Sequence, residues 1–244
     1  MGDSKLVSQG YAVATIDYRL VPDVVFPKQI HDVKAALRYL RAYAEELHIN
    51  TDKIVLWGNS AGAHLSALAA VGNVPELEDL SQGNAESSSA VDGVINWYGA
   101  YDFTTMEDQH RTLDPDWKLA ENDPMTAMLQ GQTRAASPVT YIKDTFPPIL
   151  LQHGLADPLV PWLQTQEFAS LLKEKIPNLR MEVEYFPEAK HGDPAFKTND
   201  NILRCLKFLD SIYYPDGNIP KRGELPELRF VPSRVEKYDP FEGA

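Results

Sequence analysis

The sequence predicts an α/β fold in which a mainly parallel β-sheet is covered by helices on both faces. Short apolar, β-rich runs alternate along the chain with helical stretches, and this alternation is typical of parallel strands joined by crossover helices. With 244 residues, 43% of them hydrophobic, the chain can bury the core that such a domain needs. One predicted strand runs directly into a glycine-flanked serine at residues 58–62, which predicts a tight strand-to-helix turn.

Five runs are predicted to be strands. Each is short and rich in β-branched or aromatic residues, and most are apolar throughout, as strands buried on both faces are. In chain order they are residues 10–18, 53–57, 91–98, 149–153 and 181–186.

Four stretches between and after these runs are predicted to be helices. Residues 29–47 carry apolar side chains at alternating spacings of three and four, which indicates an amphipathic helix. The other three are residues 61–71, 165–175 and 201–213.

The predicted domain spans residues 1–214 and contains one irregular insertion. Residues 99–147, between the third and fourth strands, hold tryptophan and methionine side chains and are expected to form a lid or a substrate pocket. From Pro215 onward prolines recur, and proline continues neither a helix nor a central strand. Residues 215–244 are therefore predicted to be a proline-rich C-terminal extension.

The charge of the chain limits the classes of partner that it can bind. The chain has 23 Lys and Arg against 35 Asp and Glu, a net charge of −12, which argues against nucleic acid or an anionic membrane surface because both require a basic face. No apolar run is long enough to span a membrane.

The single cysteine, Cys205, excludes an intrachain disulfide and is predicted to be buried. The first residues lack a signal-peptide pattern, so the chain as given is expected in the cytoplasm, with secretion open if a preceding segment is missing.

Ser60 is the predicted nucleophile. It lies in Gly58-Asn59-Ser60-Ala61-Gly62, between a buried strand and a helix, where the turn is strained and the two glycines are expected to make room for it. The helix N-terminus favours negative charge, so the Ala61 N–H is the predicted donor to an oxyanion. An ordinary turn with serine as the helix N-cap is the alternative.

A serine nucleophile needs a base, and His191 is the predicted one. It lies in a polar loop after the fifth predicted strand, at the carboxyl edge of the sheet where sites form in such folds. His64, one turn beyond Ser60, is predicted to pack against the site or support it. His153, at the end of a strand, is predicted to be a structural hydrogen-bonding group.

Asp157 is the predicted acid that orients the base. It follows the fourth predicted strand by a short turn that Pro158 rigidifies. A carboxylate there can accept the ring N–H of His191 and stabilise its protonated form. The alternatives are an Asx-turn role for Asp157, or Asp193 or Asp102 as the acid.

Several motifs together carry a family resemblance. They are Tyr18-Arg19-Leu20, Gly58 to Leu65, Ala136-Ser137-Pro138-Val139, Gln152-His153-Gly154 with Asp157-Pro158-Leu159-Val160-Pro161, and Lys190-His191-Gly192. On these, residues 10–214 resemble the esterase and lipase branch of the α/β-hydrolases, most of all its acetylxylan/feruloyl-esterase-like and carboxylesterase group, with kynurenine formamidase as a relative. The order serine, aspartate, histidine along the chain is that of this fold. The resemblance assigns the catalytic roles to Ser60, Asp157 and His191, and the oxyanion donor to Ala61.

One departure from the family pattern concerns the oxyanion hole. The family carries a His-Gly-Gly motif whose backbone N–H groups supply its other half, and this sequence contains no such motif. Residues 1–5 resemble those that normally follow it, so the chain is expected to be truncated at its N-terminus and to lack the family's first strands. One of these lies between the first two strands predicted here. Losing one oxyanion donor costs about 3–4 kcal/mol, a factor of roughly 10²–10³ in rate.

The resemblance implies serine-dependent hydrolysis of a carboxylic ester through an acyl-enzyme intermediate. Acetyl or feruloyl esters of plant polysaccharide are the expected substrates, either small or polymer-linked. An arylformamidase, a peptidase and a catalytically impaired remnant are the alternatives. No metal or other cofactor is predicted, because no His, Asp and Glu grouping has ligand spacing on one element.

Overall fold

The computed structural model describes residues 3–121 and 123–220. Among the described residues, Ala14–Pro220 form one compact unit, and residues 3–13 belong to a second, smaller unit. In the described part of the smaller unit, helix α1 (Asp3–Ser8) ends in a turn in which Gln9 and Tyr11 donate backbone hydrogen bonds to the Leu6 carbonyl. Most of the predicted proline-rich extension, from Lys221 onward, lies outside the described residues.

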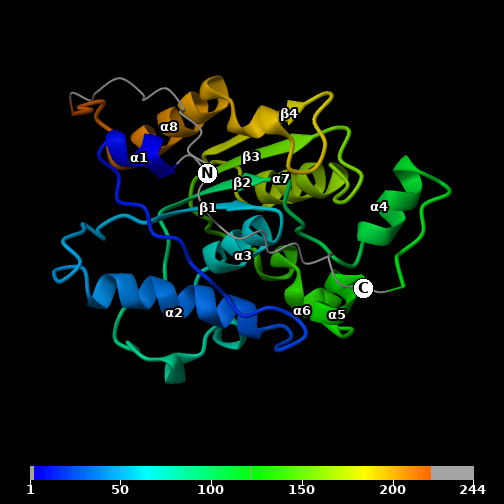
Figure 1. Ribbon diagram of the computed structural model, residues 1–244, viewed down its shortest axis with the longest axis horizontal. Helices are drawn as coiled ribbons and strands as arrows, with labels where there is room; N and C mark the ends of the chain where they lie inside the picture. The colour runs from blue at the N-terminus through cyan, green and yellow to red at the C-terminus, as the bar shows by residue number, and fades with distance from the viewer. Residues whose placement is uncertain (1–2, 122, 221–244) are drawn as a thin grey trace, which may run out of the picture. The chain divides into compact units, whose positions relative to one another are not determined.

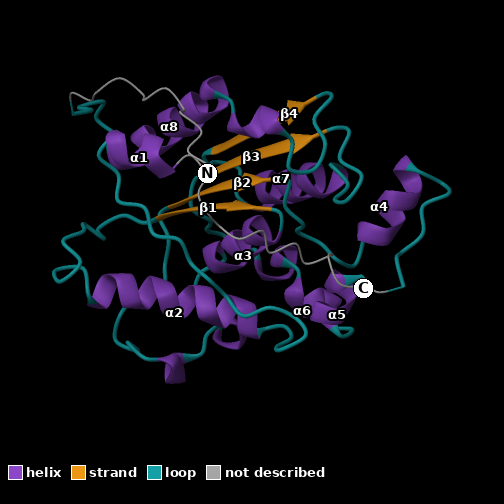
Figure 2. Cartoon of the chain, viewed as in Figure 1, coloured by secondary structure: helices purple, strands orange, loops and turns teal. Residues whose placement is uncertain are grey.

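The larger unit contains a four-stranded, fully parallel sheet (Figures 1 and 2). Its strands lie side by side in chain order: β1 (Val55–Asn59), β2 (Gly93–Trp97), β3 (Ile149–Gly154) and β4 (Met181–Phe186). These correspond to four of the five predicted strands, with ends that shift by up to two residues. The predicted α/β fold with a parallel sheet is confirmed.

The first predicted strand, residues 10–18, is wrong. No strand forms there, and residues 14–18 pair with none of the four strands of the larger unit. Most of these side chains are exposed, including Val13 at 39%. A β-rich run becomes a strand only where a neighbour satisfies its backbone N–H and C=O groups, and none of the paired strands described here does so.

The four predicted helices are present, with shifted ends. They are α2 (Lys28–Ala42), α3 (Ala61–Ala70), α7 (Leu163–Lys175) and α8 (Asn199–Tyr213). Helix α2 ends before the predicted residue 47 because residues 43–48 form turns, in which His48 adopts a left-handed conformation (φ 54°). Helix α8 begins two residues early, where the Thr198 side chain accepts the Asn201 N–H.

The segment predicted to be irregular, residues 99–147, contains short helices. These are α4 (Met106–Leu113), α5 (Pro124–Leu129), α6 (Thr133–Ala136) and the 3₁₀ turn η3 (Pro138–Tyr141). Asp123 caps α5 by accepting the Thr126 N–H, and Pro124 occupies the first turn. Further 3₁₀ turns are η1 (Pro75–Leu77), η2 (Leu80–Gln82) and η4 (Pro194–Lys197).

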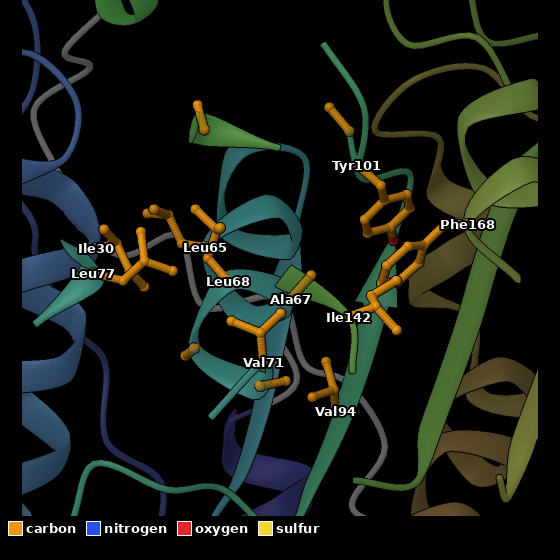
Figure 3. Close-up of a cluster of buried hydrophobic side chains, with 14 of the residues drawn as sticks. Ile30, Leu65, Ala67, Leu68, Val71, Leu77, Val94, Tyr101, Ile142 and Phe168 are labelled. Atoms are coloured by element: carbon orange, nitrogen blue, oxygen red, sulfur yellow. The ribbon is translucent and has the colours of Figure 1, made fainter. Parts of the chain in front are cut away.

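Helices cover both faces of the sheet, as predicted. On one face, Val94 and Ile149 share a core with Leu68 of α3 and Phe168 of α7. Figure 3 shows the α3 side chains beside this face, and the rings of Tyr101 and Phe168 stack at 4.2 Å. On the opposite face, side chains of β2 and β3 meet α8 and η4 through a bond between Gln152 and Asn201 and through rings of Trp97 and Phe196 at 5.7 Å.

The parallel direction of the strands brings their carboxyl ends to one edge of the sheet. Ser60 follows β1 directly, Asp157 follows β3 and His191 follows β4. Chain segments that are far apart in sequence therefore meet at this edge. Among the described residues, no helix has the length and apolar character needed to cross a membrane.

Candidate active site

Ser60 occupies a strained turn between β1 and α3. Its backbone has φ 52° and ψ −119°, a conformation that L-residues with a side chain rarely adopt and that carries strain. The turn is held because Ser60 N–H donates to the Trp97 carbonyl while the Ser60 carbonyl accepts from Ala63 and His64. The Ser60 side chain makes no N-cap hydrogen bond, which argues against the ordinary N-cap alternative.

Only at the first of the two flanking glycines is there no room for a larger side chain. A Cβ on Gly58 would lie 2.2 Å from the Gly62 carbonyl oxygen, closer than any real contact. A Cβ on Gly62 would meet nothing within 4 Å. The expectation that both glycines make room for Ser60 therefore holds for Gly58 and is wrong for Gly62.

The structure brings Ser60, His191 and Asp157 together in one hydrogen-bonded path. His191 Nε2 lies 2.8 Å from Ser60 Oγ, and His191 Nδ1 lies 2.7 Å from Asp157 Oδ2. An ionised carboxylate only accepts, so Nδ1 carries the ring proton and Nε2 is left to accept from the serine hydroxyl. This is the arrangement in which a serine can be deprotonated by an imidazole.

Asp157 is held as a buried carboxylate. Its side chain is fully buried, and its Oδ1 accepts the backbone N–H groups of Leu159 and Val160 at 2.8 and 3.0 Å. Burial alone would raise the pKa of Asp157, but hydrogen bonds from His153, His191 and the Val160 N–H hold it well below its ordinary value. The Leu159 bond is the Asx-turn bond of the alternative prediction, and the same side chain makes it while it contacts His191.

The other two candidate acids have different hydrogen-bond partners. Asp193 accepts the Ala195 N–H at 2.9 Å and the Lys190 N–H at 3.4 Å, so it shapes the loop that carries His191. Asp102 accepts the backbone N–H and the hydroxyl of Thr104, as a turn residue does.

His64 is a buried packing residue that connects α3 to the segment between β2 and β3. Its Nε2 lies 2.7 Å from the Ala136 carbonyl oxygen, and its ring contacts that of Phe103 edge-on at 4.9 Å. Burial lowers the pKa of His64 to about 4, although its hydrogen bond to Ala136 opposes this. His64 is therefore neutral at pH 7 and only a weak base, which suits packing better than general-base catalysis.

Tyr98 belongs to the site and was not singled out from the sequence. It follows β2 at the same edge and has φ 41°. Its ring packs edge-on against His191 at 4.6 Å, and its hydroxyl accepts a hydrogen bond from Asn59 at 3.2 Å. In the sequence, the one signal for Tyr98 is that an aromatic residue ends the predicted strand 91–98, the next strand along the chain after the one that precedes Ser60.

A small cavity lies within the segment between β2 and β3. It has a volume of about 190 Å³, and the stacked rings of His110 and Trp117, 4.2 Å apart, form part of its wall. Apolar side chains form most of the rest, including Phe103, Met106, Met125 and Leu129. A second, open groove of about 490 Å³ is lined by Asp17, Arg19 and Asp32 among others. Ser60, Asp157 and His191 are not among the lining residues of either space.

Among the described residues, no group of three or more His, Cys, Asp and Glu side chains is placed to hold a metal ion.

The parallel sheet with its serine turn, and the chain order serine, aspartate, histidine, define a member of the α/β-hydrolase class. The comparisons with known proteins narrow this class. The model of the BD-FAE family matches residues 2–172, and the chain belongs to that family.

Curated relatives include two esterases of Mycobacterium tuberculosis. The chain is 36% identical over 214 residues to a protein named probable carboxylic ester hydrolase LipM. The aligned region covers 86% of this chain and 49% of that protein. It is 34% identical over 175 residues to esterase LipQ, covering 70% of this chain and 40% of the relative. The chain thus spans less than half the length of these relatives.

Solved structures with the same fold include carbohydrate esterases. A bifunctional GH43-CE protein of Bacteroides eggerthii is 31% identical with a TM-score of 0.73, covering 83% of this chain and 27% of that one. A truncated carbohydrate esterase from gut microbiota is 27% identical with a TM-score of 0.71, covering 86% of this chain and 77% of that one. Butyrate-bound esterase 2 of Thermogutta terrifontis is 27% identical with a TM-score of 0.63, and the match covers 85% of this chain and 73% of that one.

Proposed function

We propose that this chain carries the catalytic centre of a serine-dependent carboxylic ester hydrolase. The observation that carries the proposal is the continuous hydrogen-bonded path from Ser60 Oγ through His191 to Asp157. Membership of the BD-FAE family and the esterase names of the relatives support it.

In the proposed reaction, Ser60 Oγ attacks the ester carbonyl carbon while His191 Nε2 takes the hydroxyl proton. The Asp157 carboxylate stabilises the imidazolium that forms. His191 then returns the proton to the departing alcohol as the carbon–oxygen bond breaks, which leaves the acyl group on Ser60. A water molecule, deprotonated by His191, attacks this acyl-enzyme and releases the acid.

The proposed donor to the developing oxyanion is the backbone N–H of Ala61, the first residue of α3. The first N–H groups of a helix have no partner within the helix, and the helix dipole favours negative charge at this end. The strained Ser60 turn sets Ala61 directly beside the reacting hydroxyl along the chain.

The proposed substrates are acetyl or feruloyl esters carried by plant polysaccharide. The BD-FAE match, the truncated carbohydrate esterase from gut microbiota and the bifunctional GH43-CE protein support this class. The aromatic, apolar cavity between β2 and β3 is the proposed acyl pocket. Phe103 in its wall contacts His64, which lies one turn beyond Ser60.

A fluorophosphonate probe and p-nitrophenyl acetate test the proposed chemistry directly. We expect stoichiometric labelling of the folded chain, and loss of both labelling and turnover in Ser60→Ala. Ser66→Ala is the matched control: it lies on the same helix and bonds the Gly62 carbonyl at 2.7 Å, so it should still be labelled. A folded wild-type chain that stays unlabelled, or labelling that persists in Ser60→Ala, would refute the proposal.

The same preparation separates the competing substrates. We expect p-nitrophenyl acetate and methyl ferulate to be turned over faster than N-formylkynurenine or a peptide anilide. The reverse order would favour an arylformamidase or a peptidase on this fold.

A further inference from the structure

A second imidazole, that of His153, contacts the carboxylate of Asp157 from inside the protein. His153 lies near the end of β3 and is fully buried. Its Nε2 is 3.0 Å from the Val160 carbonyl oxygen and 3.3 Å from Asp157 Oδ2, while its Nδ1 is 2.7 Å from Thr165 Oγ1 on α7.

The surroundings of the ring select one tautomer. A carbonyl oxygen and a carboxylate oxygen only accept hydrogen bonds, so Nε2 of His153 carries the proton and is shared between Val160 and Asp157. Nδ1 then accepts the hydroxyl proton of Thr165. The Thr165 bond therefore keeps the Nε2–H on the side of the ring that faces both the Val160 carbonyl and Asp157 Oδ2.

The two oxygens of Asp157 thus have different partners. Oδ1 accepts two backbone N–H groups from its own loop, whereas Oδ2 lies between two imidazoles, those of His191 and His153. The loop alone can hold the position of Oδ1. The negative charge on Oδ2, which is the charge that His191 experiences, is shared with His153.

We propose that His153 is a positioning residue that acts through Asp157: its Nε2–H fixes Oδ2 against His191 and limits the charge that Oδ2 presents to it. The consequences for hydrolysis rest on the proposed function of His191 as the base. The hydrogen bond from His153 is also the first among those that lower the pKa of Asp157 against the effect of burial.

Other titratable groups also face the Asp157–His191 pair in the described structure. The ring of Tyr98, at the end of β2, packs on His191. His110, on α4, has its pKa lowered by burial, while its hydrogen bond to the Leu159 carbonyl and the charge of Asp157 oppose this. Neither ring donates to Oδ2 in the way that His153 does, so replacing His153 tests this one interaction.

Removing the donor should make His191 easier to protonate. Without the Nε2–H of His153, Oδ2 carries more negative charge and stabilises the His191 imidazolium more strongly. In His153→Phe we expect the titration of the His191 ring to move up by roughly 0.5–1 pH unit, together with the acidic limb of the fluorophosphonate-labelling profile.

The experiment is an NMR titration of ¹³C-labelled histidine rings in the folded chain, with labelling rates measured on the same samples. His153→Gln places an amide N–H near the position of Nε2 and should restore the wild-type titration. His31→Phe is the matched control, because His31 is a buried imidazole on α2 whose Nε2 also contacts a backbone carbonyl, that of Glu76 at 3.2 Å. It should leave the His191 titration unchanged.

Should His153→Phe fail to fold, Thr165→Val provides the test. It removes the hydroxyl that selects the tautomer and should move the His191 titration in the same direction by a smaller amount. A His191 titration that stays in place or moves down in folded His153→Phe or folded Thr165→Val overturns the proposal. The NMR measurement does not depend on turnover. A wild-type chain that the fluorophosphonate probe does not label would refute the proposed function, but the NMR titration would still test the role of His153.

Discussion

The carboxyl edge of the sheet and the segment between β2 and β3 are built in contrasting ways. At the edge, Ser60, Asp157 and His191 are each fixed by short hydrogen bonds and by backbone turns of defined conformation. Between β2 and β3, short helices surround a cavity whose contacts are mainly apolar and aromatic. In the function proposed above, the hydrogen-bonded edge is the rigid region, as chemistry that depends on tenths of an ångström requires. The segment between β2 and β3 is then the adaptable region, suited to selecting substrates by shape.

The largest expected effect concerns the turn itself. Gly58→Ala places a Cβ 2.2 Å from the Gly62 carbonyl oxygen, so backbone must move, and we expect a loss of unfolding free energy of about 3 kcal/mol or more with loss of probe labelling. Gly62→Ala is the matched control, since its Cβ would meet nothing within 4 Å. Chemical denaturation of both variants measures the difference.

Equal stability of the two glycine variants would contradict this account of the turn. It would mean that the strand-to-helix junction can relax, and that the contrast between a rigid edge and an adaptable insertion is overstated.

The second effect concerns His64, one of the residues through which the two regions touch. Its pKa is lowered to about 4 by burial, whereas an unfolded histidine titrates near 6.5. Below pH 6.5 the unfolded chain binds a proton that the folded chain does not, so stability falls as the pH drops from 6.5 towards 4. The expected loss is on the order of 3 kcal/mol. Above pH 6.5 this contribution is constant.

Denaturation curves from pH 4 to 8 check the His64 effect. His64→Gln keeps a donor for the Ala136 carbonyl but cannot titrate, so its stability should depend less on pH across this range. A slope equal to that of the wild type would assign the pH dependence to other groups.

The same contrast explains what could be predicted from the sequence. The Ser60 turn and the loop of Asp157 are encoded locally, by glycine at residue 58 and by a short strand-to-turn spacing. The place of Tyr98 in the site is not encoded locally, because its ring packs on His191 and Phe196, which lie far along the chain. His153 was expected to be structural, and its proximity to Asp157 depends on how the loop after β3 folds back.

Strand pairing and short helices were the less predictable features. Residues 10–18 have the composition of a buried strand, but a strand depends on a neighbour that composition cannot supply. Within residues 99–147, α5 depends on one cap at Asp123 and one proline. Such brief signals lack the hydrophobic periodicity that identified α2 and α8.

The smallest expected effect is on substrate selection and tests the adaptable region. Trp117 stacks on His110 at 4.2 Å and forms part of the wall of the 190 Å³ cavity. Trp117→Ala enlarges this space, so we expect kcat/KM for p-nitrophenyl hexanoate relative to the acetate to rise about tenfold, with little change for the acetate. Leu113→Ala, at the exposed end of α4, is the control and should leave the ratio unchanged. If Trp117→Ala lowered both rates equally, the Trp117 side chain would help to hold Ser60, His191 and Asp157 in position. The proposal that one region carries out the reaction and the other selects the substrate would then be wrong.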